Sequence, residues 1–375
     1  MRIFAINDAQ VTELDGWAAL AGQAQPAHGF LWISVTREEF GAQQAAIQAQ
    51  LAALCGQPLV DLHVADLLND QLPSQYDSTS RYDLLVLRRL ATRDGANPPA
   101  PGDNGVALKP RGGPPVLRRI DTRPVGFAVY DHVLLSVHPD DGHVRDGYVT
   151  KLLGPTGIDP RAQAARLPTS PADLMLRILN RIVDAYLDLR RELTRQLDHW
   201  QLELVDTRSR FNDWGALLLA RQSLSHLGEI CEDQRAAMQD WLDSLEEAEP
   251  AAAPYDELAQ RRHELLMVRS RDLLEHISRV LHHVQRLEQN VETAVQMHFS
   301  VQSHRANDIM RMLTVLTAVF LPLNLIAGVF GMNFAYIPLL HTDGGFWWAM
   351  GAMAVIAATL VFYFWRKRYL DHADR

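Results

Sequence analysis

The sequence predicts an α+β domain, followed by a long stalk helix and two transmembrane helices at the C-terminal end. Short runs rich in β-branched and aromatic residues occupy the first part of the chain, which is typical of strands. Apolar residues then recur at intervals of three and four, which indicates helices. Two uncharged apolar runs follow, at residues 312–331 and 346–365.

The composition of the 375-residue chain limits its class. Hydrophobic residues make up 47% of the chain and charged residues 22%, as in a soluble protein. These whole-chain percentages do not reveal how apolar the C-terminal part is. The net charge of −9 argues against nucleic acid as a partner. Cys55 and Cys231 lie far apart in the sequence and favour reduced thiols over a disulfide framework.

Residues 1–170 are expected to form a cytoplasmic α/β domain. The strand candidates are RIFAI, FLWISV, YDLLVLRRL and VGFAVYDHVLLSVH. The last of these should be a hairpin that turns at Tyr130, Asp131 and His132. Residues 94–115 are rich in proline and glycine and are predicted to form a flexible loop.

Residues 171–255 are expected to form a pair of helices with an acidic tip. Ser170 is a plausible N-cap, with Pro171 at the first helical position, and the second helix should run from about Asp213 to Glu249. Residues 256–331 then read as a stalk helix that continues into the first apolar run. Its apolar positions keep a heptad-like spacing: Leu258, Leu265, Leu273, Ile277, Val280, Val284, Leu287, Val291 and Val295. A helix of about 110 Å needs other helices or subunits to pack against.

The two apolar runs are interpreted as membrane spans. Each is about twenty residues long and spans about 30 Å, the thickness of a bilayer core. A pair of buried core helices is the alternative, but the runs show almost no polar stripe. Residues 332–345 carry no lysine or arginine, whereas Arg305, Arg311 and residues 366–375 lie beyond the runs. The positive-inside rule therefore predicts cytoplasmic termini and an external 332–345 loop, and no signal peptide is expected at the N-terminus.

No enzyme motif is present in the sequence. It lacks GxxxxGK[ST], GxGxxG, HExxH, CxxC and GxSxG. We therefore expect no catalytic residue and no enzymatic cofactor.

Polar residues in the first span suggest an ion path. Asn307, Thr314, Thr317, Asn324 and Asn333 should share about a third of the helix circumference, together with Met310, Leu313 and Leu321. A bare amide in hydrocarbon is costly, so Asn324 should face protein or water. An interhelical hydrogen bond is one explanation, and a pore wall of amides and apolar constrictions is the other. Two helices cannot enclose a pore, so a pore requires a ring of subunits.

The residues ANDIMRMLT (306–314) and FLPLNLIAGVFGMNF (320–334) resemble the CorA family of divalent metal-ion transporters. The Gly-Met-Asn triplet after the first of two C-terminal spans is the signature of that family. The clear match covers roughly residues 300–370. The resemblance implies a funnel-shaped homopentamer in the inner membrane, in which each first span lines a central pore and each second span faces lipid.

The resemblance also implies roles for individual residues. Gly331, Met332 and Asn333 would form the outer selectivity filter. The pore-lining residues would be Asn307, Met310, Leu313, Thr314, Thr317, Leu321, Asn324 and Gly328, with Met310, Leu313 and Leu321 as a hydrophobic gate. Arg366, Lys367 and Arg368 would form a basic ring at the cytoplasmic end.

The transported metal stays open between Mg²⁺, Co²⁺, Ni²⁺ and Zn²⁺. Ala335 and Leu339 stand where the family often has acidic residues, which weakens the case for Mg²⁺ and points toward the zinc-transporting branch. Imidazole also suits zinc and nickel, although the histidines can equally be ordinary solvated or packing residues: His263, His276, His282, His283, His298, His304 and His341.

The acidic stretch at the end of the second helix has two interpretations. Asp240, Asp243, Glu246 and Glu247 are candidates for a regulatory metal site between subunits, or they form a solvated helix face. The leading function is a divalent-cation channel for Mg²⁺, with Co²⁺ or Ni²⁺ as further substrates. A zinc transporter, with or without proton coupling, and a membrane-tethered structural coiled coil are the alternatives.

Overall fold

A computed structural model describes residues 1–7, 10–17, 29–91, 120–153, 167–205, 214–247, 257–332 and 344–367. The chain divides into two units, Met1–Glu292 and Thr293–Arg375. Three predicted features lie outside the described residues: the 94–115 loop, most of the external loop including Asn333, and the basic tail from Arg368 onward.

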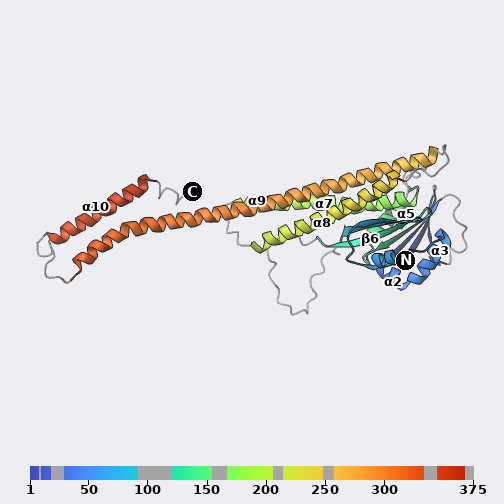
Figure 1. Ribbon diagram of the computed structural model, residues 1–375, viewed down its shortest axis with the longest axis horizontal. Coiled ribbons are helices and arrows are strands. Elements are labelled where there is room, and N and C mark those ends of the chain that lie inside the picture. Colours follow the sequence, from blue (N-terminus) through green and yellow to red (C-terminus); the bar gives the residue numbers. More distant parts are fainter. Residues whose placement is uncertain are drawn as a thin grey trace. The chain divides into compact units, whose positions relative to one another are not determined.

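A seven-stranded sheet forms the centre of the N-terminal unit (Figure 1). Its strand order is β2-β1-β3-β7-β6-β5-β4, and only β3 and β7 pair in parallel. All the strand candidates are confirmed, as is the hairpin that turns between β6 and β7. The strands are β1 (Arg2–Ile6), β2 (Val11–Leu14), β3 (Phe30–Thr36), β4 (Gln75–Ser78), β5 (Asp83–Leu90), β6 (Thr122–Val129) and β7 (Val133–His138).

Helices cover the sheet in two layers. The short helices α2 (Arg37–Ala42), α3 (Gln44–Cys55) and α4 (Asp61–Leu68) pack through Phe40, Ile47 and Val64 against one side of the strands. A capping box starts α2, because the Thr36 hydroxyl accepts the Glu39 N–H and the Glu39 carboxylate accepts the Thr36 N–H. On the other side lie α5 (His143–Leu153), α7 (Pro171–Val205) and α8 (Trp214–Glu247).

The predicted start of α7 is confirmed. The Asp173 N–H donates to the Ser170 hydroxyl at 3.1 Å, and the Leu174 N–H donates to the Ser170 carbonyl. Pro171 is the first helical residue, a position where its missing N–H costs nothing.

The stalk helix is α9 (Glu257–Phe330). A buried row with alternating three- and four-residue spacing runs along its N-terminal part: Ser270, Leu273, Ile277, Val280, Val284, Leu287, Val291 and Ala294. We call this row the α9 seam. Polar contacts beside it place α8 antiparallel to α9, namely Trp241 Nε1 to Ser270 Oγ at 3.0 Å and an Arg221–Glu292 ion pair at 3.1 Å. The predicted packing of the stalk against other helices is confirmed over this stretch.

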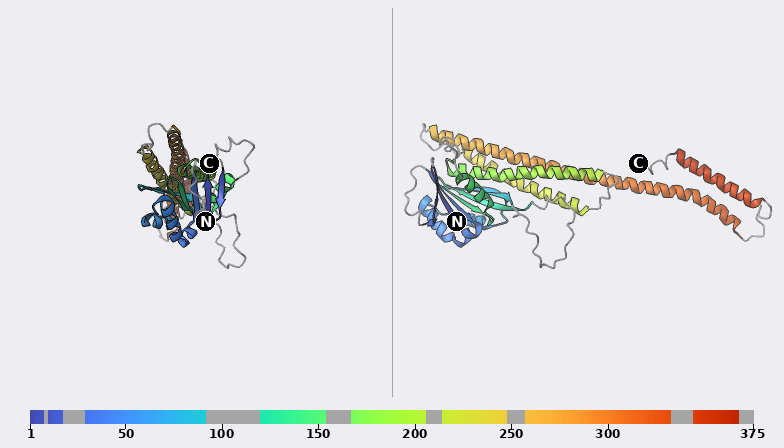
Figure 2. Two further views of the ribbon diagram at one scale, coloured as in Figure 1. Left: turned by 90° about the vertical axis from the view of Figure 1, so that its right-hand side faces the viewer. Right: turned by 180° about the vertical axis from the view of Figure 1, so that it is seen from behind.

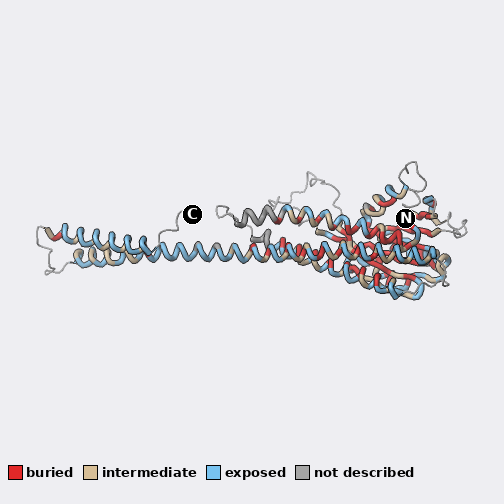
Figure 3. Tube along the Cα trace, turned by 90° about the horizontal axis from the view of Figure 1, so that it is seen from above, coloured by how far each residue is buried: buried red, intermediate tan, exposed pale blue. Residues whose placement is uncertain are grey.

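Leu265, which belongs to the predicted heptad row, has no packing partner of this kind within the described residues. That side chain is 53% exposed, and the seam begins only at Ser270. Toward the C-terminal side the seam ends at Ala294, and in Figure 3 exposed residues then dominate the later part of α9 and the last helix, α10 (Gly345–Arg366).

Candidate functional site

The C-terminal unit consists of two apolar helices that the chain leaves uncovered. Only 6% of the most apolar window of α9 and of α10 is buried. The core helix of a soluble protein would be mostly buried, so the alternative of two core helices does not fit the described residues. Exposed apolar surface on this scale requires lipid or protein around it.

The two spans pack against each other through one stripe on each helix. On α9 the less exposed residues are Val315, Ala318, Val319, Pro322, Leu323, Ile326 and Phe330. On α10 they are Gly345, Ala349, Met353, Ile356, Ala357, Leu360 and Phe364. Figures 1 and 2 show α10 running back alongside the final part of α9. The stripe on α10 includes the small residues Gly345, Ala349 and Ala357.

The polar face of the first span is turned away from α10. Every predicted pore-lining residue is exposed: Asn307, Met310, Leu313, Thr314, Thr317, Leu321, Asn324 and Gly328. At about 100° per residue, this face lies roughly opposite the stripe that packs on α10. Leu321, at its middle, is 70% exposed. We call these eight residues the α9 polar face.

Hydrogen bonding distinguishes the hydroxyls of this face from its amides. The hydroxyls of Thr314 and Thr317 donate to the carbonyls of Met310 and Leu313 at 2.7 and 2.8 Å, so neither needs another partner. Within the described residues, no group pairs with the Asn324 carboxamide, and α10 supplies no interhelical hydrogen bond to it. Water or another protein chain therefore has to satisfy that amide.

The expected place of Asn333 on the same helical face lies outside the described residues. The helix ends at Phe330, and the Gly331 N–H donates to the Ala327 carbonyl at 2.9 Å, closing the last turn. A Cβ on Gly331 would come within 3.1 Å of the Ala327 carbonyl oxygen, so a glycine fits this turn best. Gly331 and Met332 are both exposed, and their role in a filter stays a prediction.

The other predicted sites do not come together within this chain. Glu246 pairs with Arg271 at 2.9 Å, and Asp243 accepts a hydrogen bond from Gln239 at 2.7 Å. The described residues contain no group of three or more His, Cys, Asp or Glu side chains able to hold a metal ion. Asp240 and Glu247 are exposed, so a regulatory site at this acidic face stays a prediction that needs ligands from another copy.

The described stalk histidines show no shared metal site either. His283 lies 2.7 Å from the Thr194 hydroxyl, and His276 lies 3.8 Å from Asp272. The interpretation of these two as ordinary packing residues fits both contacts, and neither contact favours zinc.

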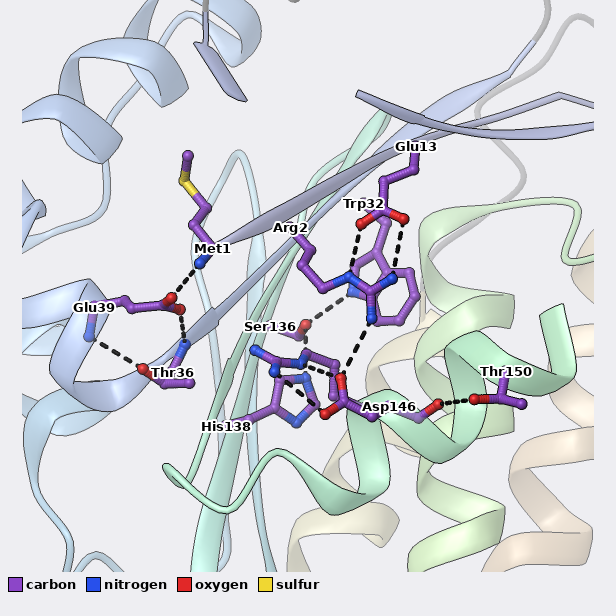
Figure 4. A network of polar contacts seen from close by, with 11 residues as sticks. Met1, Arg2, Glu13, Trp32, Thr36, Glu39, Ser136, His138, Asp146 and Thr150 are labelled. Atoms are coloured by element: carbon purple, nitrogen blue, oxygen red, sulfur yellow. Dashed lines mark hydrogen bonds and ion pairs between the residues drawn. The ribbon is translucent and has the colours of Figure 1, made fainter. Parts of the chain in front are cut away.

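The sequence interpretation missed a polar network in the N-terminal unit (Figure 4). Trp32 Nε1 donates to the Ser136 hydroxyl at 2.8 Å, and the same hydroxyl lies 2.9 Å from His138 Nε2. Nearby, Arg2 pairs with Glu13 at 2.7 Å and with Asp146 at 3.3 Å. The network links β1, β2, β3 and β7 to α5. The sequence feature that could have indicated this network is a serine and a histidine within the otherwise apolar strand VLLSVH.

Full burial of His138 perturbs its titration. Desolvation lowers the pKa of this histidine to about 3, and the positive charges of Arg145 and Arg89 act in the same direction. His138 is therefore neutral at physiological pH and is unsuited to proton transfer there.

Together these features define a membrane protein with two C-terminal spans, an α/β N-terminal unit and a first span that leaves a polar face uncovered. The family described as "CorA-like Mg2+ transporter protein" matches residues 28–368, and the chain belongs to this family. The predicted resemblance is thereby confirmed, and the family is one of transporters and not of enzymes.

Individual relatives match shorter segments. The cobalt/magnesium transport protein CorA of Thermotoga maritima is 34% identical over 100 residues, which cover 27% of this chain and 28% of that protein. The magnesium transport protein CorA of Haemophilus influenzae is 35% identical over 101 residues, covering 27% and 32%. The matched segments thus span about a third or less of these relatives.

Solved structures match over far more of the chain. The complete CorA magnesium transporter of Methanocaldococcus jannaschii aligns over 99% of both chains with a TM-score of 0.66 and 18% identity. The full-length CmaX protein covers 98% of this chain and 97% of its own, with a TM-score of 0.65 and 18% identity. The ZntB cytoplasmic domain of Vibrio parahaemolyticus covers 81% and 98%, with a TM-score of 0.51 and 14% identity. These matches confirm the predicted fold class.

Proposed function

We propose that this protein is a divalent metal-ion channel that carries Mg²⁺, and also Co²⁺ or Ni²⁺, across the inner membrane. The observation that carries the proposal is the α9 polar face, which is exposed and turned away from α10. In a ring of copies, five by the family resemblance, these faces would meet around a central path. Amides and hydroxyls would alternate there with the apolar side chains of Met310, Leu313 and Leu321.

The chemistry of this face suits a hydrated divalent cation. Mg²⁺ gives up its water reluctantly, and neutral oxygen dipoles can hold the hydrated ion without trapping it. The filter at Gly331, Met332 and Asn333 would present carbonyl and carboxamide oxygens at the outer mouth. Membrane potential supplies about 2.3 kcal/mol per charge per 100 mV, so inward movement needs no nucleotide hydrolysis.

Gly328 supports close approach of several copies. A Cβ built at this residue meets nothing within 4 Å in the chain. Packing within one chain therefore does not require glycine here, whereas approach of neighbouring backbones would.

Metal influx into proteoliposomes tests the proposal. The purified full-length protein is offered Mg²⁺, Co²⁺, Ni²⁺ and Zn²⁺ separately, with and without an inward proton gradient. Asn324→Leu and Asn333→Ala should each reduce Mg²⁺ influx at least tenfold, because each removes a carboxamide from the path. Thr359→Val is the matched control, since this exposed hydroxyl on α10 already donates to its own helix at Val355.

Other outcomes would decide between the alternatives. Influx of Zn²⁺ with little Mg²⁺, stimulated by protons, would assign the chain to zinc transport. Neither apolar run contains an acidic or histidine residue to relay protons, which weighs against tight coupling. Absence of influx of every metal from an intact oligomer would leave the membrane-tethered coiled coil.

A further inference from the structure

The C-terminal end of α10 combines exposed aromatic rings with two cations. Phe362, Tyr363 and Trp365 are 57%, 50% and 59% exposed, and Arg366 and Lys367 are exposed beside them. We call these five residues the basic end. From Gly345 to Lys367 the sequence holds no aspartate or glutamate.

Arg366 lies on the face of α10 that points away from α9. It continues an exposed stripe at helical spacing that contains Trp348, Val355 and Phe362. The stripe that packs on α9 includes Leu360 and Phe364 instead. Because the α9 polar face is also turned away from α10, Arg366 and that face lie on opposite sides of the helix pair. Arg366 is thus directed toward the surroundings of the pair and away from the proposed ion path.

Lys367 lies next to Arg366 at the same end of α10, and it contacts Tyr363. Its N–H donates to the Tyr363 carbonyl at 3.0 Å, and its ammonium lies 5.3 Å from the centre of the Tyr363 ring. The cation is therefore kept beside the aromatic rings, at the depth where amphipathic rings meet the lipid headgroups.

We propose that the basic end binds the phosphate headgroup of an anionic phospholipid. A guanidinium donates two parallel hydrogen bonds to a phosphate, and an ammonium adds a point charge. The apolar stems of both side chains can lie along the span while their charged heads reach the headgroups. The rings of Phe362 and Trp365 supply apolar surface for the acyl chain of the same lipid.

Lipid retention tests this proposal without reference to transport. Full-length protein in detergent is supplied with equal amounts of phosphatidylglycerol and phosphatidylcholine, and bound lipids are counted by native mass spectrometry. Each cation near an anionic surface contributes about fivefold, so the wild type should prefer phosphatidylglycerol and the R366Q/K367Q variant should retain at least tenfold less of it. Equal retention by wild type and variant, or equal retention of both lipids by the wild type, would overturn the proposal.

Two further variants separate binding from folding. Arg366→Lys with Lys367→Arg keeps both charges and should keep the preference. Arg279→Gln is the matched control, because Arg279 is an exposed arginine of the N-terminal unit that is ion-paired to Glu275. Loss of the preference in either variant would contradict the assignment to the basic end.

Metal flux then distinguishes the lipid site from the basic ring that the family resemblance implies. In vesicles of phosphatidylcholine alone, R366Q/K367Q should match the wild type, and a difference should arise only when phosphatidylglycerol is present. An equal change of flux in both kinds of vesicle would place these cations in the ion path and overturn the proposal. If no vesicle shows flux but lipid retention behaves as expected, the proposed channel function fails and the lipid site stands.

Discussion

Most buried polar side chains in the N-terminal unit have specific hydrogen-bond partners, and His138 is one of the exceptions. Its Nε2 faces the Ser136 hydroxyl, whereas no hydrogen-bond partner for its Nδ1 exists among the described residues. The neutral ring tolerates this arrangement. A charged ring in the same place would face Arg145 and Arg89 with only Asp146 in opposition.

This environment predicts an acid-sensitive fold. Because the pKa of His138 falls from 6.5 to about 3 on folding, the unfolded state binds the proton more readily between these values. The stability contributed by the neutral ring is complete above pH 6.5 and is lost progressively as the pH falls toward 3. At pH 4.5 the loss should be about 2–3 kcal/mol. His138→Gln keeps an acceptor for Ser136 and should flatten this part of the curve.

Denaturant unfolding of both proteins between pH 4 and 8 measures the difference. Most other ionisable groups are common to both proteins, so their contributions to the pH dependence cancel in the difference. Parallel curves for the wild type and His138→Gln would show that His138 does not cause the acid sensitivity.

A buried carboxylate at the start of α7 predicts a larger effect. Asp173 accepts the Thr169 N–H at 3.0 Å and pairs with Arg177 at 3.2 Å and with Arg269 of α9. Asp173→Asn leaves two half-buried guanidinium groups without their counter-charge, so unfolding should become easier by about 3 kcal/mol. Asp188→Asn is the control, since its pair with Arg191 is exposed and should be worth less than about 0.5 kcal/mol. Equal shifts in melting temperature for both variants would refute the argument.

At the scale of elements, the α9 seam explains how a helix of this length remains ordered beside α8. The buried row is apolar except at Ser270, whose hydroxyl accepts the Trp241 indole N–H. Flanking pairs then secure the antiparallel register, with Arg271 on Glu246 and Glu232 accepting from Gln285. A single polar position in such a row fixes the register at some cost in stability.

The α9 seam predicts that truncating two apolar residues of α9 has different effects on stability. Ile277 is 1% exposed, so Ile277→Ala should cost about 2–5 kcal/mol through the cavity that it leaves. Leu265→Ala should cost less than about 0.5 kcal/mol, because that side chain already contacts water. Thermal unfolding of the two variants compares them directly. A comparable cost at Leu265 would mean that another chain covers it.

The contrast between Ile277 and Leu265 shows how much of the stalk packing could be predicted from the sequence. Spacing of three and four correctly predicted the helix, but it carries no information on which partner lies beside each turn. The short strands β2 and β4 were missed because VTEL and QYDS lack an alternating apolar pattern. β3, β5, β6 and β7, with continuous apolar runs, were found.

The candidate sites divide in the same way: features set by local sequence spacing could be predicted, and features set by contacts between distant residues could not. The α9 polar face could be predicted because helical periodicity is local, and its outward direction agrees with the structure. The end of the first span at Gly331 was also predicted, and the last turn of the helix closes there. The Trp32–Ser136–His138 network was not predictable, since Trp32 and Ser136 are 104 residues apart in the sequence and only sheet pairing brings them together.

At the scale of the whole molecule, one chain exposes two surfaces whose polar and apolar groups need partners outside that chain. The α9 polar face exposes amides and large apolar side chains together, and α10 exposes an almost wholly apolar outer stripe. Lipid suits the second surface but not the first. A closed ring with α9 inside and α10 outside would satisfy both, because each amide would face water in the central path.

The proposed ring predicts which positions of different copies meet. In a variant with Cys55 and Cys231 replaced by alanine, Leu321→Cys should form disulfide-linked dimers in oxidised membranes, because facing positions near a central axis come within bonding distance. A disulfide needs Cβ atoms about 4 Å apart, which lipid-facing positions of separate copies do not reach. Val355→Cys, on the outer stripe of α10, should therefore stay monomeric on non-reducing gels. Asn324→Cys should react with a membrane-impermeant thiol reagent and lose metal influx, since it faces the aqueous path. Cross-linking at Val355 without cross-linking at Leu321 would reverse the arrangement and place α10 on the inside.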